Sequence, residues 1–406
     1  MKTKDMKKKQ TFLKSLLFAI LFSAPLTASA QDVLINETNF PDENFRNWLL
    51  AQDYGADGVL TAEEIGGITA LSIYYKGITS LKGIELFTAL TRLDCSDNRL
   101  TALDVSGCTA LTYLDCCNNQ LLTTLNVSKN TALTYLSCYG NQLTALDVSN
   151  NTALEWLNCI LNQLTMLDVS NNTALTELHC DGNQLTTLDV SGCTALTRLD
   201  CYGNQLTALD VSGCTALTEL YCYDNQLTAL DVSGCTKLWY LDCYNNQLTT
   251  LDVSGCTKLW YLECRNNQLT ALDMSNNTVL TGLSCYRNQI KGVSMDALIA
   301  SLPQQDQSWL YIYDDSEGNE GNVCTKTQVE AIKAKGWIPY YYDFTMWQWV
   351  EYEGSDDEET GIAQPATATT DANEPVYTLS GQKVSNGSLK GKKGVYIIGG
   401  KKVVVK

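Results

Sequence analysis

The fold is decided by the stretch Leu90-Thr-Arg-Leu93-Asp-Cys95-Ser-Asp-Asn98-Arg-Leu100-Thr-Ala-Leu103-Asp-Val105. Its first leucine recurs at positions 111, 133, 154, 175, 196, 217, 238, 259 and 280, so the period is 21 residues with a single step of 22. Ten consecutive units of nearly constant length predict a repeat architecture, in which each unit contacts only its neighbours.

The spacing Leu-x-x-Leu-x-Cys-x-x-Asn-x-Leu is the signature of a leucine-rich repeat. One coil cannot enclose its own leucines, but a column of coils can. Leu93, Asp94 and Cys95 alternate inside and outside as a short strand does. We therefore predict a β-rich leucine-rich-repeat solenoid with a parallel sheet, roughly 50 Å long at ~4.8 Å per strand, on its concave face. A helical cap should close its N-terminal end and an α/β cap its C-terminal end, before a small β tail.

Asparagines and cysteines form ladders through the repeat. One position holds Asn98, Asn119, Asn141, Asn162, Asn183, Asn204, Asn225, Asn246, Asn267 and Asn288. An inward Asn there can bond the backbone that leaves the strand. Half a repeat later, one position is shared by Cys108, Cys193, Cys214, Cys235 and Cys256 with Asn130, Asn151, Asn172 and Asn277. This exchange indicates a small inward site that accepts either residue.

The main cysteine ladder replaces a core leucine in every unit. It consists of Cys95, Cys116, Cys138, Cys159, Cys180, Cys201, Cys222, Cys243, Cys264 and Cys285. Free Cys behaves as a small buried hydrophobe. A few disulfides between rungs are conceivable, but pairing would twist a regular stack, so we expect reduced thiols. One His and no C-x-x-C pair argue against zinc.

Charge and the N-terminal segment restrict location and partners. Residues 1–30 combine a basic start, an apolar run and Ala28-Ser29-Ala30, which is typical of a Sec signal peptide; an uncleaved anchor is the alternative. These residues carry a net +5, so cleavage changes the charge from −17 to −22. A chain with this negative charge is unsuited to binding nucleic acid or anionic lipid. We expect a secreted or cell-surface protein without a transmembrane segment after cleavage.

Composition divides the remaining chain into five parts. We predict an N-terminal cap with a degenerate first repeat at 31–89, ten repeats at 90–289 and a C-terminal cap at 290–352. A flexible acidic linker at 353–375 and a short β-rich tail at 376–406 should follow. Helices are expected at Asn39–Gln52, Met295–Leu302 and Thr327–Lys335, and a strand at Leu310–Tyr313.

The N-terminal cap contains a loop that resembles an EF-hand. Asp53, Asp57, Val59, Thr61 and Glu64 fall at loop positions 1, 5, 7, 9 and 12, with Gly at position 6. Position 3 is Gly rather than a carboxylate. The loop predicts weakly bound calcium, and the alternative is a metal-free turn between capping helices. No cofactor is required elsewhere.

The outward positions of the predicted sheet are rich in aromatic and acidic residues. We expect partner-binding residues at Tyr113, Tyr135, Tyr139, Trp156, Asp200, Tyr202, Glu219, Tyr221, Tyr223, Tyr240, Asp242, Tyr244, Tyr261, Glu263 and Tyr286. Exposed aromatics on a rigid sheet can anchor protein or sugar partners. The alternative is cross-strand stacking that only stabilises the sheet.

The residues on the same face are poorly arranged for catalysis. His179 should point outward and Cys180 inward, which is unsuitable for a Cys–His dyad. Asp200 and Glu219 could imitate a glycosidase pair. However, acids recur along the whole face, so we expect a solvated acidic surface and no enzyme.

Two segments resemble known bacterial families. The 21-residue unit, with Cys in the strand and Leu-Asp-Val-Ser-x-Asn-Thr-Ala-Leu after it, resembles the internalin J-type repeats of Gram-positive surface adhesins and related surface repeats of gut and oral bacteria. Residues 376–384, 393–397 and 401–406 resemble the end of the C-terminal sorting domain of Bacteroidetes type IX secretion, and the alternative is a β module that simply ends the chain. These resemblances imply surface attachment, protein binding and export by the type IX route.

The sequence thus predicts an exported binding protein, most simply an adhesin-like module for an extracellular host or bacterial protein. Capture of a polysaccharide by the same face is the alternative function. The sequence does not identify the ligand for either function.

Overall fold

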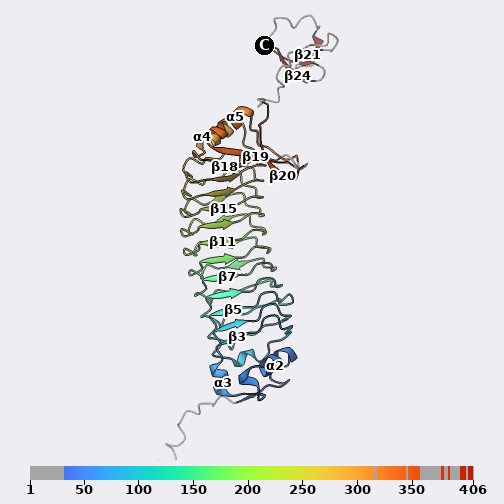
Figure 1. Ribbon diagram of the computed structural model, residues 1–406, viewed down its shortest axis with the longest axis vertical. Helices are drawn as coiled ribbons and strands as arrows, with labels where there is room; N and C mark the ends of the chain where they lie inside the picture. The colour runs from blue at the N-terminus through green and yellow to red at the C-terminus, as the bar shows by residue number, and fades with distance from the viewer. Residues whose placement is uncertain are drawn as a thin grey trace, which may run out of the picture.

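A computed structural model describes residues 32–314, 318–343 and 346–356, and the backbone of four short strands between residues 376 and 405. Coils stack into a long column (Figure 1). Helices α2 (Glu43–Leu50) and α3 (Ala62–Gly67) lie at one end of it, and α4 (Val293–Ser301) and α5 (Lys326–Ala334) lie at the other. The predicted signal peptide, residues 1–30, lies outside the described residues. No helix in the described part of the chain has both the length and the apolarity needed to span a bilayer.

One strand from each coil joins a sheet, which we call the main sheet. Its strands are parallel except at the C-terminal end, where Trp337–Asp343 and Gln348–Glu351 pair antiparallel. Its order is β3-β4-β5-β6-β7-β9-β11-β13-β15-β16-β17-β18-β19-β20. Register pairs equivalent residues, so that Leu199 lies between Leu178 and Leu220. The strands are β3 Ala70–Ser72, β4 Arg92–Asp94, β5 Tyr113–Asp115, β6 Tyr135–Ser137, β7 Trp156–Asn158, β9 Glu177–His179, β11 Arg198–Asp200, β13 Glu219–Tyr221, β15 Tyr240–Asp242, β16 Tyr261–Glu263, β17 Gly282–Ser284, β18 Ser308–Tyr313, β19 Trp337–Asp343 and β20 Gln348–Glu351. The predicted solenoid is confirmed.

A second, shorter parallel sheet runs along another side of the column. It contains β8 Leu167–Asp168, β10 Leu188–Asp189, β12 Leu209–Asp210 and β14 Leu230–Asp231. Each Asp accepts a hydrogen bond from the backbone N–H two residues later, as Asp168 does from Ser170 at 2.9 Å. This turn redirects the chain after the strand.

Columns of identical apolar side chains form the core. The leucines at the repeat positions are at most 7% exposed, and the main cysteine ladder is fully buried. All seventeen cysteines are free thiols. Several donate to the next coil, as Cys95 Sγ does to the Asp115 carbonyl at 3.4 Å. Burial raises the pKa of Cys159 to about 12, which keeps its thiol protonated.

The first asparagine ladder bonds each coil to its neighbours. The amide of Asn183 donates to the carbonyls of Cys159 and Cys180, and its Oδ1 accepts from the Leu164 N–H at 3.0 Å. Equivalent bonds recur along the column. The predicted role of the inward Asn is therefore confirmed, because it satisfies buried backbone groups that the strands leave unpaired.

The mixed ladder explains why Asn and Cys exchange. Asn172 Nδ2 donates to the Val148 carbonyl at 3.1 Å, and Cys214 Sγ donates to the equivalent Val190 carbonyl at 3.4 Å. Both residues thus donate to the equivalent carbonyl, and Asn172 Nδ2 also donates to the Asn151 carbonyl at 2.8 Å. The Oδ1 atoms of the asparagines in this ladder have no hydrogen-bond partner, whereas Cys brings no such oxygen.

The residue before each ladder asparagine has a left-handed backbone. Asp97, Asn118, Leu161, Asp224, Asn245, Asn266 and Arg287 share this conformation with Gly140, Gly182 and Gly203, and Tyr75 adopts it in the first coil. The frequent Gly, Asn and Asp follow from this requirement, since these residues tolerate positive φ best.

The N-terminal cap covers the first leucines with two helices and a partial coil. Helix α2 spans Glu43–Leu50, shorter than predicted, because Asp42 caps it by accepting from the Phe45 N–H. After the 3-10 turn η1 Asp53–Gly55, β2 Val59–Leu60 pairs with β1 Val33–Leu34, and α3 spans Ala62–Gly67. A second 3-10 turn, η2, spans Ile84–Leu86. Strand β3 pairs in register with β4, with Leu71 beside Leu93, within the segment predicted to be a degenerate first repeat.

The C-terminal cap adds α4 Val293–Ser301 and α5 Lys326–Ala334 beside strands β18, β19 and β20. These helices and β18 agree with the predicted segments to within one or two residues. The chain stays on the cap beyond residue 352, because the Ser355 N–H donates to the Cys324 carbonyl at 3.0 Å. The start of the predicted linker is therefore paired with the cap.

The tail forms an antiparallel sheet of four strands in the order β22-β21-β23-β24. They are β21 Val376–Thr378, β22 Lys383–Val384, β23 Gly394–Ile398 and β24 Lys401–Val405. The first of the three predicted β segments therefore contains two strands.

Candidate binding face

The outward side chains of the main sheet form three columns, which we call the strand face. They occupy the third, fifth and seventh positions of the repeat, as Arg92, Asp94 and Ser96 do in the first unit. In-register pairing places equivalent side chains beside one another along the column. All predicted partner-binding residues lie on this face.

The first aromatic stack consists of Tyr113, Tyr135 and Trp156. Successive ring centroids are 4.2 Å apart, with interplanar angles of 6° and 1°. Arg92 lies 3.5 Å above the free side of Tyr113, and His179 lies 5.4 Å from Trp156 at the other end. Cationic or polar groups therefore close both ends of this stack.

A second stack follows in the seventh-position column. Tyr202, Tyr223 and Tyr244 have centroid distances of 4.3 and 4.5 Å, and Arg265 lies 3.7 Å from the Tyr244 ring. Burial raises the pKa of Tyr202 to about 12, and burial together with the nearby Tyr202 hydroxyl raises the pKa of Tyr223 above its usual range. This stack is rigid, and it presents ring edges and hydroxyl groups rather than ring faces.

A third group joins Tyr221, Tyr240 and Tyr261. Their successive centroid distances are 5.0 and 5.3 Å, and Arg198 lies 4.5 Å from Tyr221. Two other predicted residues stand apart: Tyr139 is half-buried, and Tyr286 is 9% exposed and contacts Trp349 of the C-terminal cap at 5.4 Å. The structure thus brings most predicted aromatics into three stacks.

Four of the eight acids of this face are buried, so the expected solvated acidic surface is wrong for these four. Asp181, Asp200, Asp242 and Glu263 are only 3–7% exposed. Large side chains lie in register beside two of them: His179 and Tyr221 flank Asp200, and Tyr221 lies beside Asp242. Burial, with the nearby charge of Glu263, raises the pKa of Asp242 to about 7.

A charged network surrounds the only histidine. His179 Nδ1 lies 2.7 Å from Asp200 Oδ2, and His179 Nε2 lies 3.1 Å from Glu177 Oε2. Burial alone would lower the pKa of His179, but the hydrogen bonds and charges of these two acids raise it above its usual value. Arg198 links Asp200 to Glu219, its guanidinium lying 2.5 Å from the Glu219 carboxylate.

His179 and Cys180 point to opposite sides of their strand, as predicted. The histidine lies among acids on the strand face, whereas Cys180 is fully buried in the core. Burial raises the pKa of Cys180 well above its usual range. This pair is therefore unsuited to nucleophilic chemistry.

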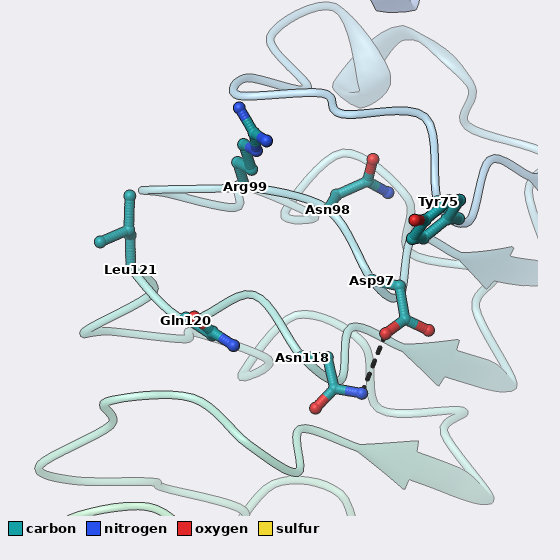
Figure 2. A pocket seen from close by; sticks show the side chains of 7 residues that line it. All are labelled: Tyr75, Asp97, Asn98, Arg99, Asn118, Gln120 and Leu121. Carbon is teal, nitrogen blue, oxygen red and sulfur yellow. Dashed lines mark hydrogen bonds between the residues drawn. The ribbon is translucent and has the colours of Figure 1, made fainter.

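A pocket opens beside the single 22-residue unit, and the sequence analysis assigned it no role. Figure 2 shows Tyr75 and Asp97 on one side of it and Leu121 on the other, with Asn118 donating to Asp97 at 3.0 Å. Leu122 occupies the buried position, so Leu121 is the extra residue and is 54% exposed.

The extra residue interrupts the bonds between coils. The Leu122 N–H turns to the Asn119 carbonyl at 2.8 Å, although the equivalent N–H of every other coil from Ile78 to Ile290 bonds an asparagine of the next coil. Asn141 Oδ1, which should accept this bond, is buried without a partner.

Two exposed tryptophans also escaped the sequence analysis. Trp239 and Trp260 are 39% and 42% exposed and lie just before strands β15 and β16, at the second position of the repeat. That position is not one of the strand-face columns. The sequence contained an indication of this exposed pair, because Thr-Lys-Leu-Trp replaces the usual Thr-Ala-Leu-Thr in these two units.

The EF-hand-like loop does not gather its carboxylates. Glu64 Oε2 accepts from both the N–H and the hydroxyl of Thr61 at 2.8 Å, and Asp57 accepts from the Val59 N–H. Among the described residues no three His, Cys, Asp or Glu side chains are close enough to hold a metal ion. This arrangement does not fit calcium, and calcium binding stays a prediction.

Comparisons with known proteins agree with this geometry. Residues 88–130 and 173–213 match the family described as Leucine Rich repeats (2 copies). Internalin J of Listeria monocytogenes serotype 4b (strain F2365) is 43% identical over 68 residues, which are 16% of this chain and only 7% of that relative.

Solved structures extend the similarity to most of the column. The functional domain of InlJ from Listeria monocytogenes, which includes a cysteine ladder, is 34% identical, with a TM-score of 0.61 over 78% of each chain. An internalin (inlF) from the same species is 22% identical, with a TM-score of 0.57 over 77% of this chain and 98% of that one. The second likeness concerns the fold alone.

Proposed function

Because the chain belongs to the internalin-like leucine-rich-repeat proteins, we propose that it is a surface or secreted adhesin-like protein that binds an extracellular protein through its strand face. It works by binding and without catalysis. Export through the Sec signal peptide at residues 1–30 is part of this proposal, as is type IX sorting by the tail at 376–406.

The observation that supports this proposal most directly is the tyrosine stack of Tyr202, Tyr223 and Tyr244. The rings hold one another in place, so little side-chain entropy is lost when a partner covers them. Their hydroxyl groups and the acids beneath them offer directed hydrogen bonds. Protein interfaces are enriched in such rigid amphipathic side chains.

Stacking bears on the alternative function, polysaccharide capture by the same face. A sugar ring packs best on an exposed aromatic face, but both faces of Tyr223 and Tyr244, and one face of Tyr202, are covered by a neighbouring tyrosine or by Arg265. Ring edges and hydroxyls suit a protein surface better. We therefore favour a protein partner for the strand face.

The test is binding of the full chain to extracellular matrix proteins and to a glycan array. In the test variant Tyr202, Tyr223 and Tyr244 are replaced by Ala, and in the control Met166, which is exposed outside the strand face, is replaced by Ala. We expect protein binding that is lost only in the test variant. Protein binding that survives this change would refute the assignment, and glycan binding lost in the same variant would establish polysaccharide capture instead.

A further inference from the structure

Two adjacent coils depart from the repeat in the same two places. Lys237-Leu-Trp239 and Lys258-Leu-Trp260 stand where the other eight units have Ala or Val and then Thr or Glu. These are two of only three lysines in residues 90–289. A paired substitution, made twice in neighbouring coils, creates a local surface that differs from the rest of the column.

The geometry places both pairs on the outside. Leu238, between Lys237 and Trp239, is fully buried, so its two exposed neighbours point outward. The Trp260 N–H donates to the Trp239 carbonyl at 2.8 Å, which fixes the two coils in register. The indole centroids lie 6.2 Å apart with a tilt of 53°.

Tyrosines of the strand face support the indoles. Tyr240 meets Trp239 edge to face at a centroid distance of 5.8 Å, and Tyr261 lies 6.3 Å from Trp260. The tilt between the two indoles prevents them from covering each other as the stacked tyrosines do. Each indole therefore keeps apolar area open to solvent, and exposed apolar area of this kind marks binding surfaces.

We propose that these two coils form a second binding site, distinct from the tyrosine stacks, for a polysaccharide that carries carboxylate groups. The C–H face of a sugar ring packs on an exposed indole, and this contact removes apolar area of both from water. One Trp and one Lys recur per coil at a spacing of ~4.8 Å. A repeating site of this kind matches a repeating polymer.

The charge of the site favours an acidic polysaccharide over a neutral one. The protein carries −17 overall, so a polyanion is repelled except where cations are concentrated. Lys237 and Lys258 supply two ammonium groups beside the indoles, and among the described residues neither has an ion-pair partner. They are available to pair with successive carboxylates of the ligand.

The test measures the affinity of the full chain for polygalacturonate, with fully methyl-esterified polygalacturonate as the uncharged ligand. One variant carries Trp239→Thr and Trp260→Thr, and the other carries Lys237→Ala and Lys258→Ala. Both restore the residues common in other coils, so folding should be retained. We expect each variant to weaken binding about tenfold or more, and the lysine variant to remove most of its salt dependence.

Two further variants sharpen the result. Ala216→Lys with Thr218→Trp adds a third unit beside Trp239 and should strengthen binding several-fold. Replacing Tyr202, Tyr223 and Tyr244 with Ala should leave polygalacturonate binding unchanged, which separates this site from the proposed protein interface. No binding to polygalacturonate, unchanged affinity in the tryptophan variant, equal affinity for the methyl ester, or preference for dextran sulfate would overturn the proposal.

Discussion

Deletion of Leu121 should stabilise the solenoid. The residue is the extra member of the only 22-residue unit, and its side chain is 54% exposed, so its removal exposes no core. The deletion returns the unit to 21 residues. Leu122 N–H should then reach Asn141 Oδ1, as the equivalent N–H does in the other coils.

The magnitude follows from the bond that is restored. Asn141 Oδ1 is buried without a partner, and an unsatisfied buried polar atom costs about 1–3 kcal/mol. We therefore expect the free energy of unfolding to rise by about 1–3 kcal/mol. Urea denaturation followed by circular dichroism measures this change, and amide exchange at Leu122 should slow in parallel.

The matched control places an extra Leu between Gln163 and Leu164, in a regular unit. It should lose the bond from Leu164 N–H to Asn183 Oδ1 and reduce stability by a similar amount. The reasoning would be refuted if the deletion lowered stability, or if the insertion had no effect on it.

Three further predictions concern the core and the strand face. Asn172→Cys should lower the free energy of unfolding by at most about 1 kcal/mol in urea titrations, because Cys keeps the donor to the Val148 carbonyl and removes the unpartnered Oδ1, which offsets the lost bond to the Asn151 carbonyl. Asn172→Ala removes both bonds and should cost about 1–3 kcal/mol. Folding raises the pKa of Asp242 to about 7 and also raises the pKa of His179, so the folded chain binds more protons than the unfolded chain. Thermal stability should therefore fall as pH rises from 5 to 8. Asp242→Asn should raise the free energy of unfolding by about 1 kcal/mol or more at pH 8 and have little effect at pH 5. A thiol reagent should modify at most Cys117 in the native chain, because Cys117 is the only cysteine that is not buried. After unfolding it should modify all seventeen cysteines. Rapid reaction of several thiols in the native chain would contradict the reduced, buried ladder.

Calcium binding by the EF-hand-like loop is testable in the same way. A calcium ion would have to break the bonds between Glu64 and Thr61. We expect at most millimolar affinity, measured by calorimetry, with Glu64→Gln as the control. Submicromolar binding would show that the loop rearranges readily.

The periodicity was sufficient to predict the fold, because a 21-residue spacing of Leu, Cys and Asn allows only stacked coils. It also assigned Asn183 and its equivalents to backbone bonds correctly. The left-handed residue before each asparagine was missed, although the frequent Gly, Asn and Asp at that position indicated it.

The strand face was predicted only in part. Alternation along the strand showed which side chains point outward, but it did not show what neighbouring coils place over them. Asp200 and Asp242 are outward and nevertheless buried, because large side chains in register cover them. Stack geometry depends on rotamers, and a one-dimensional pattern does not specify rotamers.

The constant register of the coils has an evolutionary consequence. Because each coil bonds only the one before and the one after it, a whole 21-residue unit can be duplicated or lost without displacing any other contact. Recombination between such similar units would change the length of the protein in steps of one strand. The number of coils, and with it the length of the molecule, can thus change while the surface that each coil carries stays the same.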